Sequence, residues 1–544
     1  MGIRFELMNA TSLKESKIGQ ATIIIAVFSL IAKILGLVRD AVFSHQFGAS
    51  VTIDAYFAAF RIPDFIYNLL ILGTFSVAFI PVFSEYLLKD RKEADKLASS
   101  IINVTLLMML SVTVIAYIFI NPLVHAIAPG FTGQAFDLTK TFTKIFLLSP
   151  LFLTLSSIVS SMLNTHRRFT MVAIAPVMYN LSIIGAAIWL YPRFGPSGLA
   201  FGVVLGAFLH FIIQIPQIFS LGFRYSFGID STNKGFRKFW KLYWPRIFSM
   251  GTEQVTSLIV SIFGSFVGTG ALAAFYYANN LQSVFLGIFA VSFAIAIFPL
   301  LSDLHNNKDL GGFKDVLAKT TIQILFFMIP LSIIMLIERA QIVRLVLGIG
   351  QGTQFTFTNT RVVSQALGLF SISLFAQALI PLFTRAFYAM QNTVIPVFIG
   401  LITIGFNIIV TYYLTPRLGV EGMALSFSIT SIINLLILIM ELHYKLGNIH
   451  DEYLIVNSLK IIIAAVMGGA STFVSLYMVA PFVNMHTYWG VLIQAGIAGL
   501  VGIGVYLGMG WLLGLSESHD LVKLARTTGN KIGRPINIIW NWMS

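Results

Sequence analysis

The chain has 544 residues, of which 57% are hydrophobic and 10% are charged, with no cysteine and a formal net charge of +13. A soluble domain carries about 25% charged residues, so this composition excludes an ordinary soluble protein and indicates a polytopic α-helical membrane protein. Without cysteine there are no disulfides, thiolate metal sites or cysteine nucleophiles. Long apolar segments also exclude a β-barrel, whose strands are short and alternate in polarity.

Segments of mostly apolar residues recur along the whole chain. A membrane-spanning helix takes roughly 20 such residues, so we expect about fourteen spans. They lie near residues 21–47, 55–85, 99–128, 139–163, 169–191, 197–220, 240–267, 270–302, 317–346, 362–388, 393–414, 421–443, 456–480 and 487–514. The first twenty residues are polar and do not resemble a signal peptide, so the first span is expected to direct insertion.

Lysine and arginine cluster in alternate connections between the spans, at 14–17, 89–96, 167–168, 237–241, 308–319 and 523–534. By the positive-inside rule, these connections and both termini are predicted to be cytoplasmic. The same rule accounts for the positive net charge without nucleic acid as a partner. Arg339, Arg344 and Arg361 flank a connection predicted to lie outside, and we interpret them as helix-end cations that snorkel toward water.

The first span carries charges that an ordinary span avoids, namely Lys33, Arg39 and Asp40. A charge in a bilayer is costly and usually faces a protein interior or a water-filled transport path. The two cations are six residues apart, so their side chains point about 120° apart and fit one wide cavity. We interpret them as a site for an anionic substrate. The alternatives are an ion pair of Arg39 with Asp40 or Asp54, and a snorkelling Lys33.

The second span combines two acids, an arginine and a proline. Asp54 is predicted to belong to the substrate site or to cap the start of its own helix. Arg61 and Asp64 form an opposite pair at i, i+3 on either side of Pro63, which kinks a helix. A kink beside a cavity suits either a gate or a static bend.

Two further groups are predicted to bind a coupling ion. Glu253 lies in the middle of the seventh span and is interpreted either as a proton or Na⁺ site or as the partner of a cation such as Arg246. Thr403, Asn407 and Thr411 form an i, i+4, i+8 polar stripe, which supplies oxygens to Na⁺ or bonds neighbouring helices. No metal centre or cofactor is predicted, and transport is expected to use Na⁺, H⁺ or the membrane potential.

The chain also repeats itself. Residues 192–200 read PRFGPSGLA and residues 416–424 read PRLGVEGMA, 224 residues later; IPVFSE at 80–85 and FPLLSD at 298–303 are 218 residues apart. Each copy holds six predicted spans, and an even number gives both copies the same orientation, as in transporters built from two parallel lobes around the substrate site. The predicted organisation is an N-lobe at 1–222, a cytoplasmic linker at 223–238, a C-lobe at 239–445, two further spans at 446–515 and a basic cytoplasmic tail at 516–544.

Six motifs along the chain together resemble one transporter family. They read LGLVRD at 35–40, DAYFAAFRIPD at 54–64, GTFSVAFIPVFSEY at 73–86, APGF at 128–131, FYYANNL at 275–281 and RAFYAMQNT at 385–393. In this order they resemble the MurJ (MviN) lipid II flippases, a branch of the MOP superfamily that also holds MATE antiporters. The resemblance extends to about residue 445, and the number of spans in the family matches the number expected here.

The resemblance implies a flippase, not an enzyme. Its substrate would be the undecaprenyl-diphosphate-linked peptidoglycan precursor lipid II, moved from the inner to the outer leaflet of the bacterial cytoplasmic (inner) membrane by alternating access. It implies a monomer whose partners are the bilayer and this lipid-linked anionic substrate. A flippase for another polyprenyl-linked glycan and a MATE-like cation-coupled exporter stay open as alternatives. A MATE-like exporter is expected to have an acidic cavity without cations. The cations Lys33 and Arg39 therefore argue against the exporter.

The resemblance also assigns site residues. The family's cavity arginines correspond to Lys33, Arg39, Tyr67 and Asn280, so two of these positions are neutral here. Arg61 or Arg246 is a candidate replacement for the missing charge. The predicted substrate-binding residues are therefore Arg39, Lys33, Asp40, Asp54, Arg61 and Asn280, and the predicted ion-coupling residues are Glu253, Asn407 and Thr411.

Overall fold

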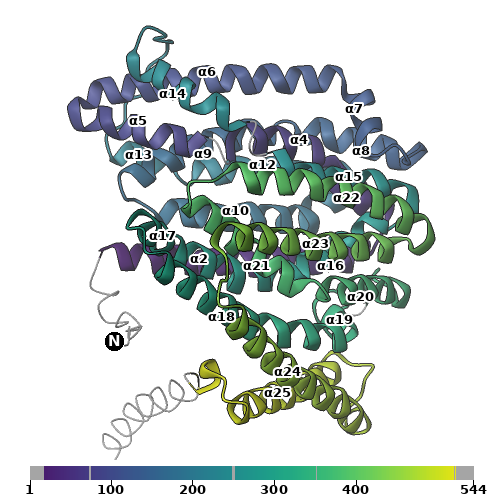
Figure 1. The fold of residues 1–544 in the computed structure, drawn as a ribbon. Coiled ribbons are helices and arrows are strands. Elements are labelled where there is room, and N and C mark those ends of the chain that lie inside the picture. The colour runs from purple at the N-terminus through teal and green to yellow at the C-terminus, as the bar shows by residue number, and fades with distance from the viewer. Residues whose placement is uncertain (1–16, 73–74, 248–250, 351, 520, 522–544) are drawn as a thin grey trace, which may run out of the picture. The chain divides into compact units, whose positions relative to one another are not determined.

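The structure is a computed structural model that describes the chain except for residues 1–16, 73–74, 248–250, 351, 520 and 522–544. In this part of the chain every regular element is a helix (Figure 1), which confirms the predicted all-α fold. The chain divides into two compact units. The first comprises Met1–Tyr277, Val346–Asn359 and Asn407–Met423, and the second comprises Ala278–Leu345, Thr360–Phe406 and Ala424–Ser544.

The helices follow one another with short connections. The first half of the chain holds α2 (Lys17–Phe47), α3 (Val51–Ala59), α4 (Arg61–Tyr67), the π-helical segment η1 (Asn68–Leu72), α5 (Phe75–Lys89), α6 (Arg91–Ile118), α7 (Ile120–Ile127), α8 (Gly133–Phe146), α9 (Ser149–Thr165), α10 (Thr170–Gly185), η2 (Ala186–Leu190), α11 (Tyr191–Phe194), α12 (Pro196–Ile212), α13 (Ile215–Ser220), α14 (Lys234–Ile247) and α15 (Gly251–Val267). The second half holds α16 (Ala271–Phe285), η3 (Leu286–Val291), α17 (Ser292–Asn306), α18 (Leu310–Ile337), α19 (Arg339–Val346), α20 (Phe357–Ser371), α21 (Leu374–Ala389), α22 (Val394–Leu418), α23 (Val420–Leu446), α24 (Asp451–Val479), η4 (Ala480–Phe482) and α25 (Tyr488–Leu512).

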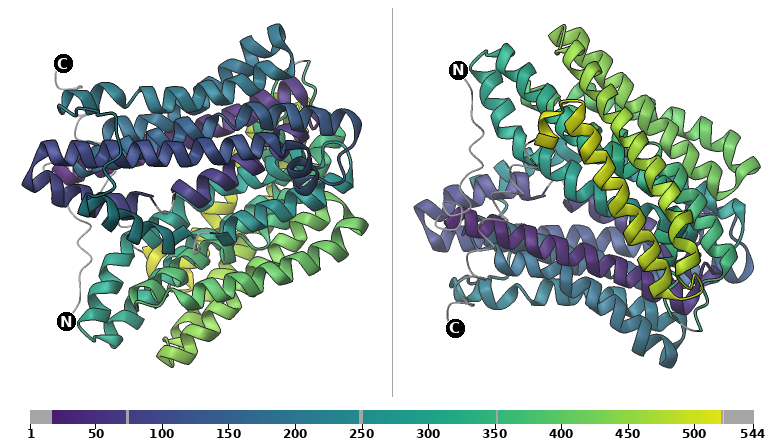
Figure 2. Two further views of the ribbon diagram at one scale, coloured as in Figure 1. Left: turned by 90° about the horizontal axis from the view of Figure 1, so that it is seen from above. Right: turned by 90° about the horizontal axis from the view of Figure 1, so that it is seen from below.

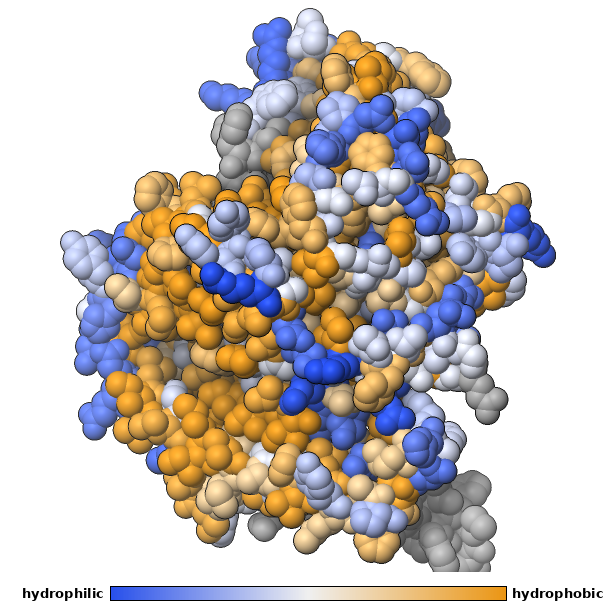
Figure 3. Space-filling view, turned by 90° about the vertical axis from the view of Figure 1, so that its right-hand side faces the viewer, coloured by the Kyte–Doolittle hydropathy of each residue, from blue (hydrophilic) through white to orange (hydrophobic). Residues whose placement is uncertain are grey.

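Many of these helices are long and apolar enough to cross a membrane. Among the described residues there are 11 such helices, or up to 12 when the bent pair α20 and α21 counts as one span. The charged helix α2 is not among them, and α15 contributes only the shorter apolar helix Gln254–Val267. The polytopic membrane fold is therefore confirmed, while the number fourteen stays a prediction. Figure 3 shows the extended apolar areas that such a protein leaves on its surface.

The sequence repeat at 192–200 and 416–424 has the same backbone geometry in both copies. Gly195 lies between α11 and α12, and Gly419 lies between α22 and α23. Both glycines have a φ of +60°, a conformation that glycine adopts without strain. Each donates its amide to the carbonyl four residues earlier at 2.8 Å. At Gly198 and Gly422, a Cβ would collide with the carbonyl oxygen eight residues earlier. The motif therefore encodes a tight helix-to-helix turn in which both glycines are required.

The second repeated pair marks a change of helix type. The π-helical segments Asn68–Leu72 and Leu286–Val291 begin 218 residues apart, the same offset as the second sequence repeat. Each precedes a helix with an internal proline, Pro81 in α5 and Pro299 in α17. A π-helical turn inserts an extra residue into a helix and is frequent at functional sites. Both copies therefore carry an irregular helix at the same place.

Residues 221–233, here called the strap, connect α13 to α14 without a helix of their own. Side chains of α6 hold this segment along its length. Ser99 and Ser100 accept the amides of Ser226 and Asp230 at 3.1 Å each, and Asn103 donates to the carbonyl of Gly228 at 2.7 Å. The strap is therefore fixed to the first unit by bonds that satisfy its backbone.

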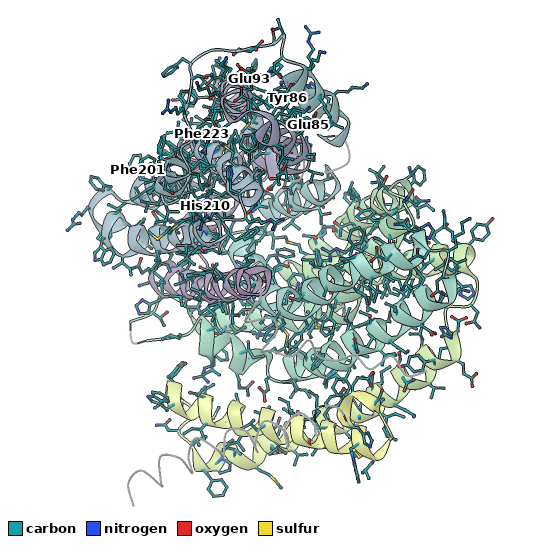
Figure 4. The ribbon with its side chains drawn as sticks, turned by 90° about the vertical axis from the view of Figure 1, so that its left-hand side faces the viewer. Glu85, Tyr86, Glu93, Phe201, His210 and Phe223 are labelled. Atoms are coloured by element: carbon teal, nitrogen blue, oxygen red, sulfur yellow. The ribbon has the colours of Figure 1, made fainter. Side chains whose placement is uncertain are left out.

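The strap leads directly into α14, whose start is fixed to the end of α5. The amide of Gly235 donates to the Tyr86 hydroxyl at 2.9 Å, and Lys238 pairs with Glu85 at 2.8 Å. Figure 4 labels Glu85 and Tyr86 at one end of the first unit. Further along, the Tyr243 hydroxyl donates to the carbonyl of Leu70 at 2.6 Å. The seventh predicted span thus starts as a helix of the first unit.

In the second unit, α24 and α25 form a tight hairpin that packs on α18 (Figure 2). A Cβ on Gly468 would lie 2.8 Å from the carbonyl oxygen of Gly502, and a Cβ on Gly502 would collide with the Thr472 hydroxyl. The Tyr506 hydroxyl donates to the carbonyl of Phe326 in α18 at 2.7 Å. Small residues that bring backbones together are typical of helix pairs inside membranes. The predicted lobe, linker and tail boundaries stay predictions.

Candidate functional site

Arg39 and Asp40, on α2, form an ion pair with each other. The Nε and Nη2 atoms of Arg39 donate to one oxygen of Asp40 at 3.0 and 2.8 Å. The Asp40 side chain is 2% exposed and the Arg39 side chain is 21% exposed. The ion-pair alternative for Arg39 is therefore present, and the Arg39 side chain remains partly exposed. A buried carboxylate needs such a partner because an unpaired charge is costly to bury.

Lys33 lies further back on α2 and is partly exposed. Within the described residues it makes no ion pair within 4.0 Å. It stands six residues from Arg39, which corresponds to about 9 Å along a helix. Lys33 therefore carries a charge that no carboxylate of the described chain neutralises.

Asp54 is 2% exposed and caps a helix from a distant part of the sequence. Its two oxygens accept the backbone amides of Gly270 and of Ala273, the latter at 2.8 Å. These amides form the start of α16, where unpaired N–H groups and the helix dipole favour a negative charge. The alternative prediction that Asp54 caps the start of its own helix is wrong, because Ser50 occupies the N-cap position of α3. Asp54 instead ties α3 to α16.

Three more contacts, like those of Asp54, join segments of the first unit that are far apart in the sequence. The Ser44 hydroxyl donates to the carbonyl of Leu347 at 2.7 Å, and the amide of Gln354 donates to the carbonyl of His45 at 2.9 Å. The Ser265 hydroxyl accepts the amide of Gly130 at 2.9 Å. Together with Asp54, these contacts join the ends of α2, α3 and α7 to segments that follow residue 260. We call this set the clamp.

A hollow of about 240 Å³ opens beside the clamp. Asp54, Gly130, Thr132, Gln134, Ser265 and Thr269 are among its lining residues. Val51, Phe131 and Ala135 also line it, so its wall is part polar and part apolar. The polar part of this wall includes Asp54 and Ser265, which make hydrogen bonds of the clamp.

Arg61 begins α4 after the helix breaks at Phe60. Its Nε donates to the carbonyl of Phe57 at 3.0 Å, and its guanidinium lies over the Tyr276 ring, 4.8 Å from the centroid. No ion pair joins it to Asp64 in the described structure, so the expected i, i+3 pair does not form. A cation over an aromatic face is attracted to the ring, which leaves the predicted anion-binding role untested.

The predicted ion-coupling residues lie on α15 and α22. The side chain of Glu253 lies outside the described residues, as does that of Arg246. Next to Glu253, the Gln254 side chain accepts from Asn68 of the π-helical segment at 3.0 Å. On α22, Asn407 and Thr411 are 4% and 3% exposed. The polar stripe is therefore buried, and no group of three or more His, Asp or Glu side chains suited to a metal occurs among the described residues.

The buried stripe is longer than the three predicted residues Thr403, Asn407 and Thr411. Thr415 follows Thr411 at the same spacing of four residues, is 4% exposed, and has a hydroxyl without a hydrogen-bond partner in the described structure. The continued i, i+4 period was the signal that could have identified it.

Comparison with known proteins assigns the family. The family model described as lipid II flippase MurJ matches residues 43–493. The chain belongs to this family. Among curated relatives, the probable lipid II flippase MurJ of Buchnera aphidicola subsp. Acyrthosiphon pisum is 29% identical over 498 residues, covering 90% of this chain and 96% of the relative. The resemblance noted from the motifs is thereby confirmed.

Solved structures agree with this assignment. A lipid II flippase MurJ in an inward closed conformation matches with a TM-score of 0.75 and 27% identity, covering 92% of this chain and all of that one. An inward-facing MATE family transporter of the MOP superfamily matches with a TM-score of 0.65 and 14% identity, covering 79% of this chain and 99% of the transporter. The second likeness establishes the MOP-type fold alone.

Two positions depart from the arginines expected of a MurJ-type cavity, and both are neutral. The Tyr67 hydroxyl shares a hydrogen bond with Ser157 at 3.0 Å inside the first unit. Asn280, on α16, is partly exposed and belongs to the second unit. In the first unit, Ser156, the neighbour of Ser157 in the chain, bonds to Nδ1 of His210 at 2.6 Å, and His210 is labelled in Figure 4. The cations that remain described near the start of the chain are therefore Lys33, Arg39 and Arg61.

Proposed function

We propose that this protein moves the lipid-linked peptidoglycan precursor lipid II from the inner to the outer leaflet of the bacterial cytoplasmic membrane. The match of the MurJ family model over residues 43–493 carries this proposal. The family is one of transporters rather than of catalysts. The substrate joins an anionic diphosphate to a long lipid chain, so its head needs cations while its tail remains in the bilayer.

Arg39 is proposed to bind the diphosphate. Its guanidinium already offers two donors to a single carboxylate oxygen of Asp40. A phosphate group accepts the same pair of parallel donors with good geometry. Asp40 then serves as the partner of Arg39 between transport cycles, so the cation is never buried alone. Lys33 and Arg61 add positive charge, and Asn280 contributes a neutral polar contact.

The clamp is proposed to close one end of the transport path. Its bonds join polar side chains, and in one case a backbone carbonyl, to backbone groups near helix ends, and water can replace each of them when the path opens. Both ends of an alternating-access path must open in turn, so a closure made of exchangeable hydrogen bonds suits this role. Asn407 and Thr411, with Glu253, are the proposed site for Na⁺ or H⁺ that drives the cycle.

A flippase for another polyprenyl-linked glycan is the second candidate. Tyr67 and Asn280 replace two cavity cations, and a head group with a different arrangement of negative charge would tolerate that loss. Both candidates share the diphosphate and the polyprenyl chain. The head group is therefore the part of the substrate that distinguishes them.

Replacing the flippase of a depleted strain tests the proposal. The protein should restore growth and restore exposure of lipid II at the outer leaflet, because transport of this precursor is essential to the wall. Arg39→Ala should abolish both even when its level is matched to that of the wild type, and Arg39→Lys, which keeps a charge beside Asp40 without the planar fork, should accumulate normally and retain partial transport. Normal transport by Arg39→Ala would make the Arg39–Asp40 pair purely structural.

Orientation is tested separately. Both termini and the strap are proposed to be cytoplasmic, with the protein working as a monomer. The chain has no cysteine, so a cysteine introduced at Asn233 is a unique label. An impermeant thiol reagent should not modify it in intact cells and should modify it after lysis. Labelling in intact cells would reverse the proposed orientation.

A further inference from the structure

A second hollow, of about 620 Å³, lies in the second unit where α18 and α24 begin. The first turn of α18 supplies Lys314 to its wall, and the start of α24 supplies Asp451, Glu452, Tyr453 and Val456. The loop between α23 and α24 closes the hollow with His450. These residues are separate from the Arg39 site and from the clamp.

The hollow holds charges of both signs, and two of them are open. His450 is engaged by Asp315 at 2.7 Å, and Asp451 faces His443 at 3.6 Å. Lys314 and Glu452, in contrast, make no ion pair within the described residues. Since Lys314 is partly exposed and Glu452 is exposed, one cation and one carboxylate remain available to a ligand that carries both charges.

The position of the hollow fixes its surroundings in the membrane. Both α18 and α24 are long and apolar enough to cross a bilayer, so their first turns lie at the level of the lipid head groups. From Val456, exposed apolar side chains continue along α24 at helical spacing: Val456, Leu459, Ile463 and Val466 are 43%, 53%, 51% and 52% exposed. The hollow therefore opens onto a lipid-facing stripe.

We propose that this hollow binds a phospholipid whose head group carries both a phosphate and a primary ammonium. Lys314 pairs with the phosphate and Glu452 with the ammonium, while one acyl chain lies on the stripe below Val456. Charge complementarity favours this ligand over an anionic phospholipid, which would meet the carboxylates of Asp451 and Glu452 without a cation of its own. The apolar stripe favours a lipid over a soluble phosphate compound.

Native mass spectrometry of the intact protein tests the proposal, with phosphatidylethanolamine and phosphatidylglycerol as the two probes. Wild-type protein should retain phosphatidylethanolamine in preference to phosphatidylglycerol. Glu452→Gln should lower retention of phosphatidylethanolamine by up to about fivefold, the effect of losing one exposed charge contact, and should not lower retention of phosphatidylglycerol, which loses an unfavourable carboxylate. Lys314→Ala should lower the retention of both lipids.

Matched controls separate this site from general attraction to lipids. Lys319→Ala and Glu441→Gln remove like charges from α18 and α23 outside the hollow, and both should retain phosphatidylethanolamine as the wild type does. Equal retention of the two lipids by wild-type protein would overturn the proposal. So would unchanged retention of phosphatidylethanolamine by Glu452→Gln, or an equal loss in the control variants.

Discussion

The clamp of the first unit and the α24–α25 hairpin of the second hold helices together by different physical means. In the clamp, the Asp54 carboxylate and the Ser44 and Ser265 hydroxyls bond to backbone groups at the ends of segments. In the hairpin, Gly468 and Gly502 bring two backbones together, and side chains such as Tyr506 add single bonds. Water can replace the bonds of the clamp, whereas nothing in a bilayer replaces close packing. We therefore expect the clamp to open during transport and the hairpin to stay intact.

Removing the charge of the clamp should have the largest effect. Asp54→Asn keeps the size of the side chain but puts an amide where the buried amides of Gly270 and Ala273 need a negative acceptor. Such a bond to a charged group contributes about 1.5–3 kcal/mol. Transport should fall at least about tenfold, which corresponds to 1.4 kcal/mol, while accumulation stays near normal.

A cysteine at Ala273, which is fully buried, reports whether the clamp has loosened. Thiol labelling at this position should rise in the Asp54→Asn background and stay low with Asp54 intact. If labelling is equally low in both, the carboxylate does not control the closure, and the contrast between clamp and hairpin fails.

Crowding the hairpin should lower stability rather than alter the cycle. Gly502→Ala places a Cβ against the Thr472 hydroxyl, and overpacking of this kind costs about 1–3 kcal/mol. The detergent-solubilised protein should unfold at a lower temperature. Gly504→Ala is the matched control on the same helix, because a Cβ there meets nothing within 4 Å. Equal stability of the two variants would show that the close approach is not what holds the hairpin.

The smallest expected effect concerns the strap, which resembles the clamp in its bonding. The Thr232 hydroxyl and the amides of Thr232 and Asn233 donate to Asp230, and these bonds lower the pKa of Asp230 from its ordinary value. A carboxyl with a lowered pKa stabilises the fold above its ordinary pKa, and that contribution is lost as the pH falls through the lowered value.

Hydrogen exchange measures this effect. Protection of the Thr232 and Asn233 amides should be retained near neutral pH and decline in acid, and Asp230→Asn should remove the pH dependence. An unchanged pH profile in Asp230→Asn would show that the Asp230 carboxylate does not protect these two amides.

Much of the fold follows from local sequence features. Apolar segments of sufficient length predict the spans, and the repeated glycines at Gly195 and Gly419 predict two equivalent turns. The adjacent charges of Arg39 and Asp40 predict an ion pair as one of two alternatives, because neighbouring residues on a helix end can reach each other. Each of these features depends on residues close together in the chain.

The parts that could not be predicted depend on distant partners. Nothing near Asp54 indicates that the donors to its carboxylate are backbone amides 216 and 219 residues further along, because backbone groups have no sequence signature. For the same reason the contacts of the strap could not be predicted, because its backbone amides donate to serines of α6 that have no distinguishing sequence pattern. The cation–aromatic contact of Arg61 replaced the expected pair with Asp64, since the Tyr276 ring comes from another helix.

The strap has a consequence for biogenesis. The side chains of α6 that hold it are synthesised before it, and α14, whose Arg237 donates to the carbonyl of Ser231 at 3.1 Å, follows at once. A nascent chain that has emerged only as far as α14 therefore already contains every partner needed to fix this connection. Segments synthesised later then fold against a first half that is already partly ordered. The order of synthesis therefore favours correct insertion of the first half.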